Sequence, residues 1–143
     1  MFLLPRCGIS QPSSIRSACM KLKIKKIYGK GNYRNECVVL KVLEDCEMGR
    51  HLVAKAGLSD DGKEAMRCKQ AYWFPDQQVK KGDFVWLYTR AAGVGELSIW
   101  SSTPKSTTYT FFWGLTAEVW DNEWDYIVIT EAAMWSGKPV NKA

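Results

Sequence analysis

The ten residues KKGDFVWLYT, at positions 80–89, carry the pattern that decides the fold of this chain. A Gly-Asp turn signal opens the segment, and the residues after it alternate between two sets. These sets are Phe84, Trp86 and Tyr88 on one side, and Val85 and Leu87 on the other. A period of two is typical of a β-strand, so the segment predicts a strand with one aromatic and one aliphatic face.

Similar short runs recur along the chain at spacings of about 8–15 residues, with turn signals between them. They lie at residues 21–28, 36–43, 51–58, 62–74, 95–100, 106–113 and 124–130. The run at 62–74 contains good helix formers, yet Met66 and Cys68 alternate with Arg67 and Lys69, which favours a strand. About eight short strands without a long helix predict an all-β fold, either a sandwich or a barrel.

The length of 143 residues fits a single domain that buries one core. Residues 1–19 lack the alternation, and Met20 stands directly before the first predicted strand. We interpret residues 1–19 as a flexible leader or as an upstream start of translation, and a targeting segment is the alternative. We interpret residues 20–143 as one β-sandwich domain. No run approaches the roughly 20 apolar residues that span a bilayer, so we expect no membrane contact.

The net charge of +5 is unevenly distributed. Residues 1–35 hold eight Lys and Arg and no acid, whereas the other 108 residues hold 12 Lys and Arg and all 15 acids, a net charge of −3. A basic arm can contact phosphates or an acidic partner, and lysines can equally protect an edge strand from pairing. Its candidate binding residues are Lys21, Lys23, Lys25, Lys26 and Lys30. Strict alternation predicts that Lys23 and Lys25 share one face and that Lys26 points the other way.

The five cysteines form an odd set without a CxxC pair, and His51 is the only histidine. This composition argues against a disulfide scaffold or a zinc site and favours a reducing compartment, which we expect to be the cytoplasm. We interpret the cysteines as small core residues and expect no metal and no cofactor.

Residues 110–130, TFFWGLTAEVWDNEWDYIVIT, combine many aromatic residues with four acids. The first interpretation is a sandwich core in which Trp113 and Trp120 cap strand ends, while the turn acids, Asp125 above all, bond local backbone N–H groups. A calcium loop is a second reading, but the Gly and distal Glu of an EF-hand are missing. A third is an aromatic platform for bases or glycans, for which Trp124 is the best candidate.

Catalytic residues are scarce. His51 lies in the sequence MGRH, where we expect a turn at the surface rather than a general base. The glycines of AAGVGE lack the Lys-Ser/Thr that completes a phosphate-binding loop, and no GxSxG motif is present. Adjacent turn acids are usually solvated, so we expect a protein that is not an enzyme.

The order of these segments, from about Met20 to Trp135, resembles the lamin tail domain family, an immunoglobulin-like β-sandwich. The most specific matches are Trp113-Gly114, Val119-Trp120, Asn122 and Asp125. A second group of matches is Phe74, Pro75, Gly82, Val85 and Tyr88. The chain departs from the family at Ala56, where a tryptophan is usual. The resemblance implies an immunoglobulin-like sandwich that binds protein or nucleic acid.

We therefore predict a non-catalytic β-sandwich module that engages a macromolecular partner, a protein first and nucleic acid through the basic arm second. The alternative is an OB-like barrel that binds single-stranded nucleic acid with the basic N-terminal strand and exposed aromatic residues. A secreted structural module is a weaker possibility, because the cysteines have no pairing pattern. Two observations would distinguish the sandwich module from the OB-like barrel. They are whether the sheet closes and whether the lysines lie beside exposed aromatic rings.

Overall fold

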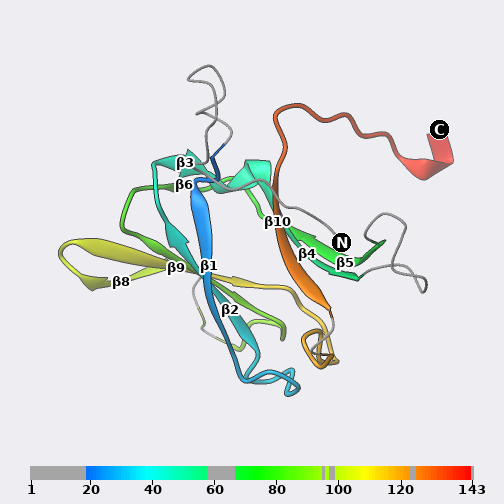
Figure 1. Ribbon diagram of the computed structural model, residues 1–143, viewed down its shortest axis with the longest axis horizontal. Helices are drawn as coiled ribbons and strands as arrows, with labels where there is room; N and C mark the ends of the chain where they lie inside the picture. Colours follow the sequence, from blue (N-terminus) through cyan, green and yellow to red (C-terminus); the bar gives the residue numbers. More distant parts are fainter. Residues whose placement is uncertain (1–18, 58–66, 95, 97–98, 123–124, 143) are drawn as a thin grey trace, which may run out of the picture.

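The computed structural model describes residues 19–57, 67–94, 96, 99–122 and 125–142 (Figure 1). In this part of the chain the regular structure is β, apart from two 3-10 turns, η2 (Met48–Arg50) and η3 (Val140–Lys142). The strands are β1 (Leu22–Tyr28), β2 (Cys37–Val42), β3 (Cys46–Glu47), β4 (His51–Gly57), β5 (Arg67–Trp73), β6 (Gln78–Val79), β7 (Phe84–Tyr88), β8 (Ile99–Thr103), β9 (Ser106–Phe112) and β10 (Tyr126–Glu131). No helix among the described residues has the length and apolar character to cross a membrane.

The strands form three open sheets. The largest has five strands in the order β1-β2-β7-β9-β8, the second has the order β10-β4-β5, and β3 pairs with β6. All pairs are antiparallel except β7 and β9, which run parallel. In Figure 1 the five-stranded sheet lies to the left and the three-stranded sheet to the right. The all-β prediction is confirmed and the arrangement is sandwich-like; within the described residues, β1 and β8 remain the edges of the largest sheet.

Each of the eight predicted segments overlaps an observed strand, including 62–74, where β5 begins at Arg67. The sequence did not indicate β3 and β6, because two residues are too few to show alternation. These two short strands pair with each other and carry the buried side chains of Cys46 and Val79.

The core lies between the five-stranded and three-stranded sheets. Strand β7 turns Val85 and Leu87 inward, and β10 packs Ile127 and Ile129 against the same cluster. Trp120 is 6% exposed and its ring centroid lies 6.3 Å from that of the partly buried Trp113. The predicted core role of these two tryptophans is therefore confirmed.

A buried carboxylate ties three separate loops together. Glu36, directly before β2, is fully buried, and its Oε1 accepts hydrogen bonds from Thr89 Oγ1 at 2.8 Å and from the Val119 N–H at 2.9 Å. Its Oε2 accepts from the N–H groups of Gly31 at 2.9 Å and Trp120 at 3.1 Å. The carboxylate thus fixes the β1–β2 hairpin, the end of β7 and the loop before β10 at one end of the molecule.

Candidate binding surface on the five-stranded sheet

The side of the five-stranded sheet that points away from the core carries three rows of side chains. Cross-strand register defines them, because directly paired residues point to the same side of a sheet. The rows are Tyr28, Cys37, Tyr88 and Phe112; then Lys26, Val39, Trp86 and Thr110; and then Lys23, Lys41, Phe84 and Thr108. None of these twelve positions is acidic and three are lysine. We call this surface the outer face.

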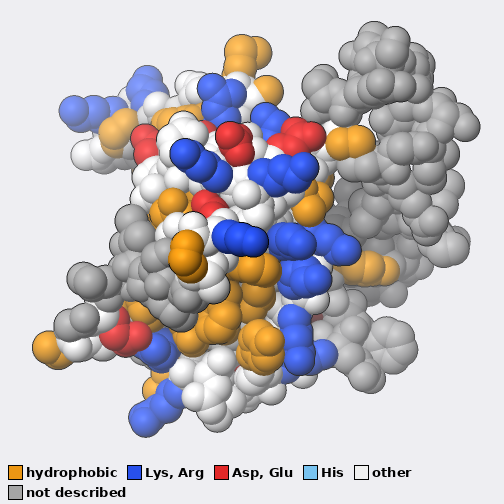
Figure 2. All heavy atoms as spheres, turned by 90° about the vertical axis from the view of Figure 1, so that its left-hand side faces the viewer, with side chains coloured by type: hydrophobic (Ala, Val, Ile, Leu, Met, Phe, Trp, Pro, Cys, Tyr) orange, Lys and Arg blue, Asp and Glu red, His pale blue; other side chains and the backbone are white. Residues whose placement is uncertain are grey.

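Four rings of the outer face form a continuous aromatic patch. The centroids of Tyr28 and Trp86 lie 6.2 Å apart, and those of Trp86 and Tyr88 lie 6.3 Å apart. The rings of Tyr88 and Phe112 stack at 5.6 Å with an interplanar angle of 13°. Tyr28 is 45% exposed and the other three are half-buried. Figure 2 faces this side of the molecule and shows hydrophobic side chains gathered beside Lys and Arg side chains.

Cations border the aromatic patch on two sides. Lys26 Nζ lies 4.5 Å from the centroid of the Tyr28 ring. The guanidinium carbon of Arg90 lies 4.7 Å from the centroid of Tyr88 and 5.1 Å from that of Phe112. These distances fall within the roughly 6 Å over which a cation is attracted to a ring face. The outer face therefore presents aromatic surface and positive charge together.

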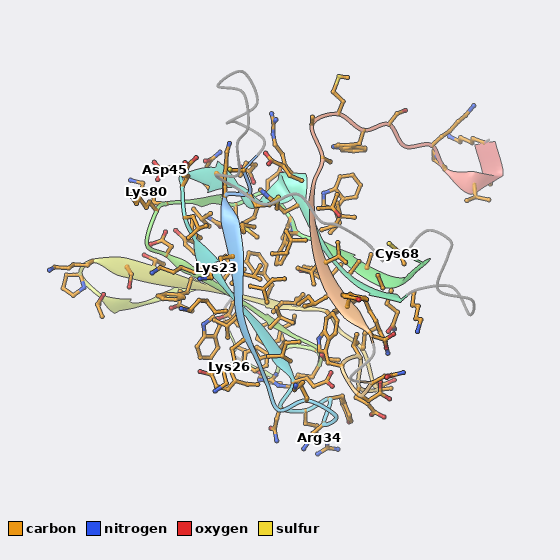
Figure 3. The ribbon with its side chains drawn as sticks, viewed as in Figure 1. Lys23, Lys26, Arg34, Asp45, Cys68 and Lys80 are labelled. Carbon is orange, nitrogen blue, oxygen red and sulfur yellow. The ribbon has the colours of Figure 1, made fainter. Side chains whose placement is uncertain are left out.

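The prediction that Lys26 points away from the face of Lys23 is wrong, and the predicted place of Lys25 on that face stays a prediction. The register of β1 against β2 shifts between Ile24 and Lys26, so a β-bulge adds Lys25 as one extra residue. Beyond the bulge the alternation is inverted, and Lys26 and Tyr28 join Lys23 on the outer face. Figure 3 labels Lys23 and Lys26 along β1.

The other candidate residues of the basic arm lie apart from the aromatic patch. Lys21 precedes β1 and is half-buried, and its carbonyl accepts hydrogen bonds from the N–H groups of Leu43 and Glu44. Lys30 lies in the β1–β2 hairpin and lines a separate pocket. Trp124 lies outside the described residues, so its predicted exposure stays a prediction.

Sequence reasoning missed two cations of this surface. Lys41 is paired directly with Lys23 in the outer face, and Arg90 covers the stacked rings of Tyr88 and Phe112. The sequence pattern around Lys41 and Arg90 could have indicated that both belong to this surface. Lys41 interrupts an otherwise apolar strand, and Arg90 follows Tyr88 by two residues, which places it on the aromatic side of the alternation.

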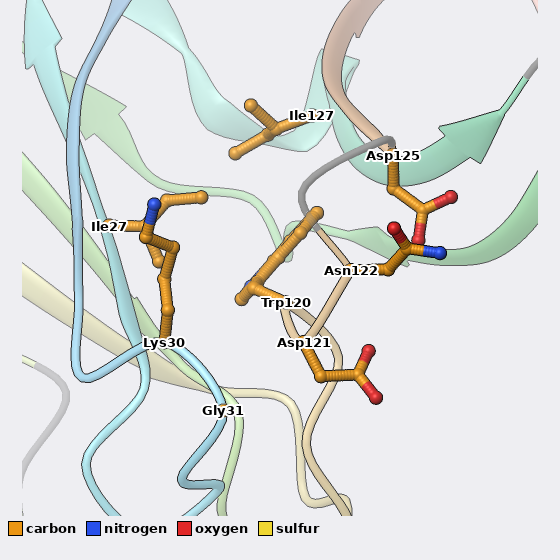
Figure 4. Close-up of a pocket in the computed structure, with 8 residues that line it drawn as sticks. All are labelled: Ile27, Lys30, Gly31, Trp120, Asp121, Asn122, Asp125 and Ile127. Atoms are coloured by element: carbon orange, nitrogen blue, oxygen red, sulfur yellow. The ribbon is translucent and has the colours of Figure 1, made fainter.

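The pocket beside Lys30 has a volume of about 280 Å³ (Figure 4). Its walls are Ile27, Lys30, Gly31, Trp120, Asp121, Asn122, Asp125 and Ile127. It therefore lies where the β1–β2 hairpin meets the loop before β10.

The acids at this pocket are occupied by lysines of the three-stranded sheet. Asp125 Oδ1 accepts a hydrogen bond from Lys69 Nζ at 2.8 Å, and Lys55 Nζ lies 3.3 Å from both Asp125 Oδ2 and Asp121 Oδ1. The pKa of Asp125 is lowered, mainly by the hydrogen bond from Lys69. Its carboxylate thus joins the loop to β4 and β5, and the expectation that Asp125 bonds local backbone N–H groups stays a prediction. Among the described residues no group of three or more His, Cys, Asp or Glu is placed to hold a metal ion.

His51 is not the surface residue that its sequence context suggested. It begins β4 and is fully buried. Its Nδ1 lies 2.9 Å from the Glu47 carbonyl oxygen, which can only accept, so Nδ1 carries the proton. The Nε2 atom is buried and has no hydrogen-bond partner among the described residues. Burial lowers the pKa of His51 and keeps the ring neutral.

No model of a known protein family matches this chain, and no curated protein matches it. Function therefore has to be inferred from the fold and from the geometry of the outer face.

Proposed function

We propose that this protein is a non-catalytic binding module that holds single-stranded nucleic acid on its outer face. The observation that carries this proposal is the aromatic patch of Tyr28, Trp86, Tyr88 and Phe112 with cations directly against it. Proteins that bind single strands combine such rings with a positively charged track along the backbone.

Bases and phosphates would each find a partner here. A nucleobase can stack on an aromatic ring whatever its identity, and one such contact contributes about 1–3 kcal/mol. Lys26 stands in the row of Trp86, and Lys23 and Lys41 stand in the neighbouring row, where these lysines would meet the phosphates. The three strand spacings from Tyr28 to Phe112 amount to about 14 Å, enough for a few nucleotides of an extended strand.

The proposed partner is a single strand because the contacts require unstacked bases. In a duplex the ring faces of the bases are covered by their neighbours, and only their edges and the phosphates can be reached. The five-stranded sheet is open, so bases can stack on a flat surface. An open sheet also argues against the alternative of an OB-like barrel.

The finer fold and cellular assignments are part of the same proposal. The resemblance to lamin tail domains and the sandwich-like pair of sheets support an immunoglobulin-like fold. Burial raises the pKa of the Cys37 thiol to about 12 and that of Cys46 to about 11. These two buried thiols are inert, whereas Cys68 is exposed, so the expectation that the cysteines are core residues is wrong for Cys68. Free thiols are compatible with the reducing cytoplasm that we propose as the location.

A second candidate function is protein binding, the partner class that the sequence favoured. It is supported by the rings of Trp73 and Trp135, which meet edge to face at 4.8 Å and are 40% and 66% exposed. Tryptophan is among the residues enriched at protein interfaces. Loss of a pulled-down protein partner in Trp135→Ala, with single-strand binding unchanged, would support this role.

Fluorescence anisotropy with a labelled 12-nucleotide oligothymidine tests the main proposal. Trp86→Ala should weaken binding by about 5- to 150-fold, the equivalent of one lost stacking contact of about 1–3 kcal/mol. Trp73→Ala removes an exposed indole from the other sheet and is the matched control. If Lys23, Lys26, Lys41 and Arg90 each neutralise a phosphate, log K should fall with log salt with a slope of about −3. Equal affinities of Trp86→Ala and Trp73→Ala, or tighter binding of the matching duplex, would refute the proposal.

A further inference from the structure

Arg90 is held in place by two aromatic rings, by Glu96 and by the Ala91 carbonyl, to which its Nη1 donates a hydrogen bond at 2.9 Å. Its guanidinium lies over the stacked rings of Tyr88 and Phe112, which come from the neighbouring parallel strands β7 and β9. It also forms two parallel hydrogen bonds to Glu96, from Nη1 to Oε1 at 2.7 Å and from Nη2 to Oε2 at 2.9 Å. The rings fix the position of the cation, and the carboxylate occupies its hydrogen-bonding edge.

Glu96 is placed by its own short loop. Its N–H donates to the Gly93 carbonyl at 3.1 Å, and the Gly93 N–H donates back to Glu96 Oε1. The hydrogen bonds from Arg90 and from Gly93 lower the pKa of Glu96, so that its side chain is an anion at neutral pH. An anion therefore already occupies the end of the aromatic patch.

We propose that Glu96 is an internal stand-in for phosphate, and that a phosphate of the bound strand replaces its carboxylate on Arg90. This inference rests on the proposed function. The fork of a guanidinium matches a phosphate as well as a carboxylate, and both can accept two parallel hydrogen bonds. After the exchange Arg90 keeps its place over the rings, because the contacts with Tyr88 and Phe112 do not involve Glu96.

The exchange is feasible because the ion pair is accessible. The side chains of Arg90 and Glu96 are 26% and 36% exposed, and exposed pairs of this kind stabilise a protein little. A phosphate can approach from solvent, while Glu96 can turn towards water and stay hydrated. The same bond that keeps Arg90 oriented in the free protein therefore competes with the ligand and lowers its affinity.

Removing the charge of Glu96 should consequently tighten binding. Glu96→Gln should bind the oligothymidine about two- to five-fold more tightly, the range that corresponds to an exposed ion pair. Arg90→Gln should bind more weakly and flatten the salt slope by about 0.7. In the double variant, Glu96→Gln should bring no gain, since no guanidinium is left to release. Asp76→Asn, the same change of charge at an exposed acid between β5 and β6, is the matched control.

The test is a set of anisotropy titrations of the full chain with the 12-nucleotide oligothymidine at about 50 mM salt, roughly a third of the physiological ionic strength, where charge interactions are less screened. Tighter binding by Glu96→Gln alone, absent from Asp76→Asn and from the Arg90→Gln background, would support the exchange. An unchanged Glu96→Gln, in a protein whose binding still depends on Trp86, would overturn the exchange and leave the proposed function standing. A wild-type protein that does not bind overturns both. Polyglutamate is added as a competitor beside the unlabelled strand. If both displace the oligonucleotide equally well, Arg90 binds an acidic protein partner instead, and the exchange is overturned.

Discussion

Replacing Glu36 with alanine should destabilise the protein by about 3–6 kcal/mol. The carboxylate accepts four hydrogen bonds at 2.8–3.1 Å, three of them from backbone N–H groups. Hydrogen bonds to a charged group contribute about 1.5–3 kcal/mol each, which gives roughly 6–12 kcal/mol in total. Removal of the side chain also relieves the cost of burying a carboxylate, about several kcal/mol, and the difference is the predicted loss. A loss of this size is comparable to the stability of a whole small domain, about 5–15 kcal/mol.

Glu36→Gln is the matched variant, because it keeps the shape and removes the charge. The best orientation places the amide nitrogen at the position of Oε1, where the Thr89 hydroxyl can rotate to accept from it. The Val119 N–H then faces another donor and loses its bond, while Gly31 and Trp120 keep theirs. One orphaned buried donor costs about 1–3 kcal/mol, so the glutamine variant should be intermediate.

Urea unfolding followed by tryptophan fluorescence provides the free energies, since Trp113 and Trp120 lie at the affected loop. Thr89→Val, which deletes a single bond to Glu36, should cost about 1–3 kcal/mol and remains measurable if the alanine variant does not fold. Losses below about 1 kcal/mol in all three variants would refute the view that this carboxylate joins the loops.

Three further predictions concern the core and the first hairpin. Because the folded state lowers the pKa of His51, the unfolded chain takes up the proton first, and stability should fall below about pH 6.5 by at most about 1.4 kcal/mol per pH unit. His51→Asn keeps a donor for the Glu47 carbonyl and should abolish this dependence in urea titrations between pH 7.5 and 5.5; a persisting slope would exclude His51 as its source. Gly29→Ala should lower the melting temperature much more than Gly31→Ala. Both glycines have a positive φ, but only at Gly29 would the added Cβ clash, at 2.8 Å from backbone atoms of Asn35. Trp120→Ala should cost about 3–5 kcal/mol in urea unfolding, and a cost below about 1 kcal/mol would contradict its place in the core.

The alternation along β7 was sufficient to predict both of its faces from the sequence. Val85 and Leu87 are in the core and the aromatic residues are on the outer face, as a period of two requires. The same rule failed in β1, because the bulge at Lys25 inserts one residue and inverts every position after it. A bulge depends on the partner strand, so the lysine pattern alone could not reveal it.

Contacts between distant segments account for the other failures. Glu36 was not predicted as a buried residue, because two of its donors, Val119 and Trp120, lie more than 80 positions away in the sequence. His51 follows a short turn, yet pairing of β4 with β10 and β5 encloses it. Of the binding surface, the sequence predicted a basic strand and an aromatic strand. It could not predict that β2 lies between them, with Lys41 completing the row.

The two faces of β7 also limit how a lineage of such proteins could change. Substitution of Trp86 or Tyr88 alters the outer face and leaves Val85 and Leu87 in the core. Insertion or deletion of a single residue would instead exchange the two faces, driving large rings into a space filled by aliphatic side chains. Recognition can therefore diverge residue by residue within a strand of fixed length, whereas changes of length are confined to the connecting loops.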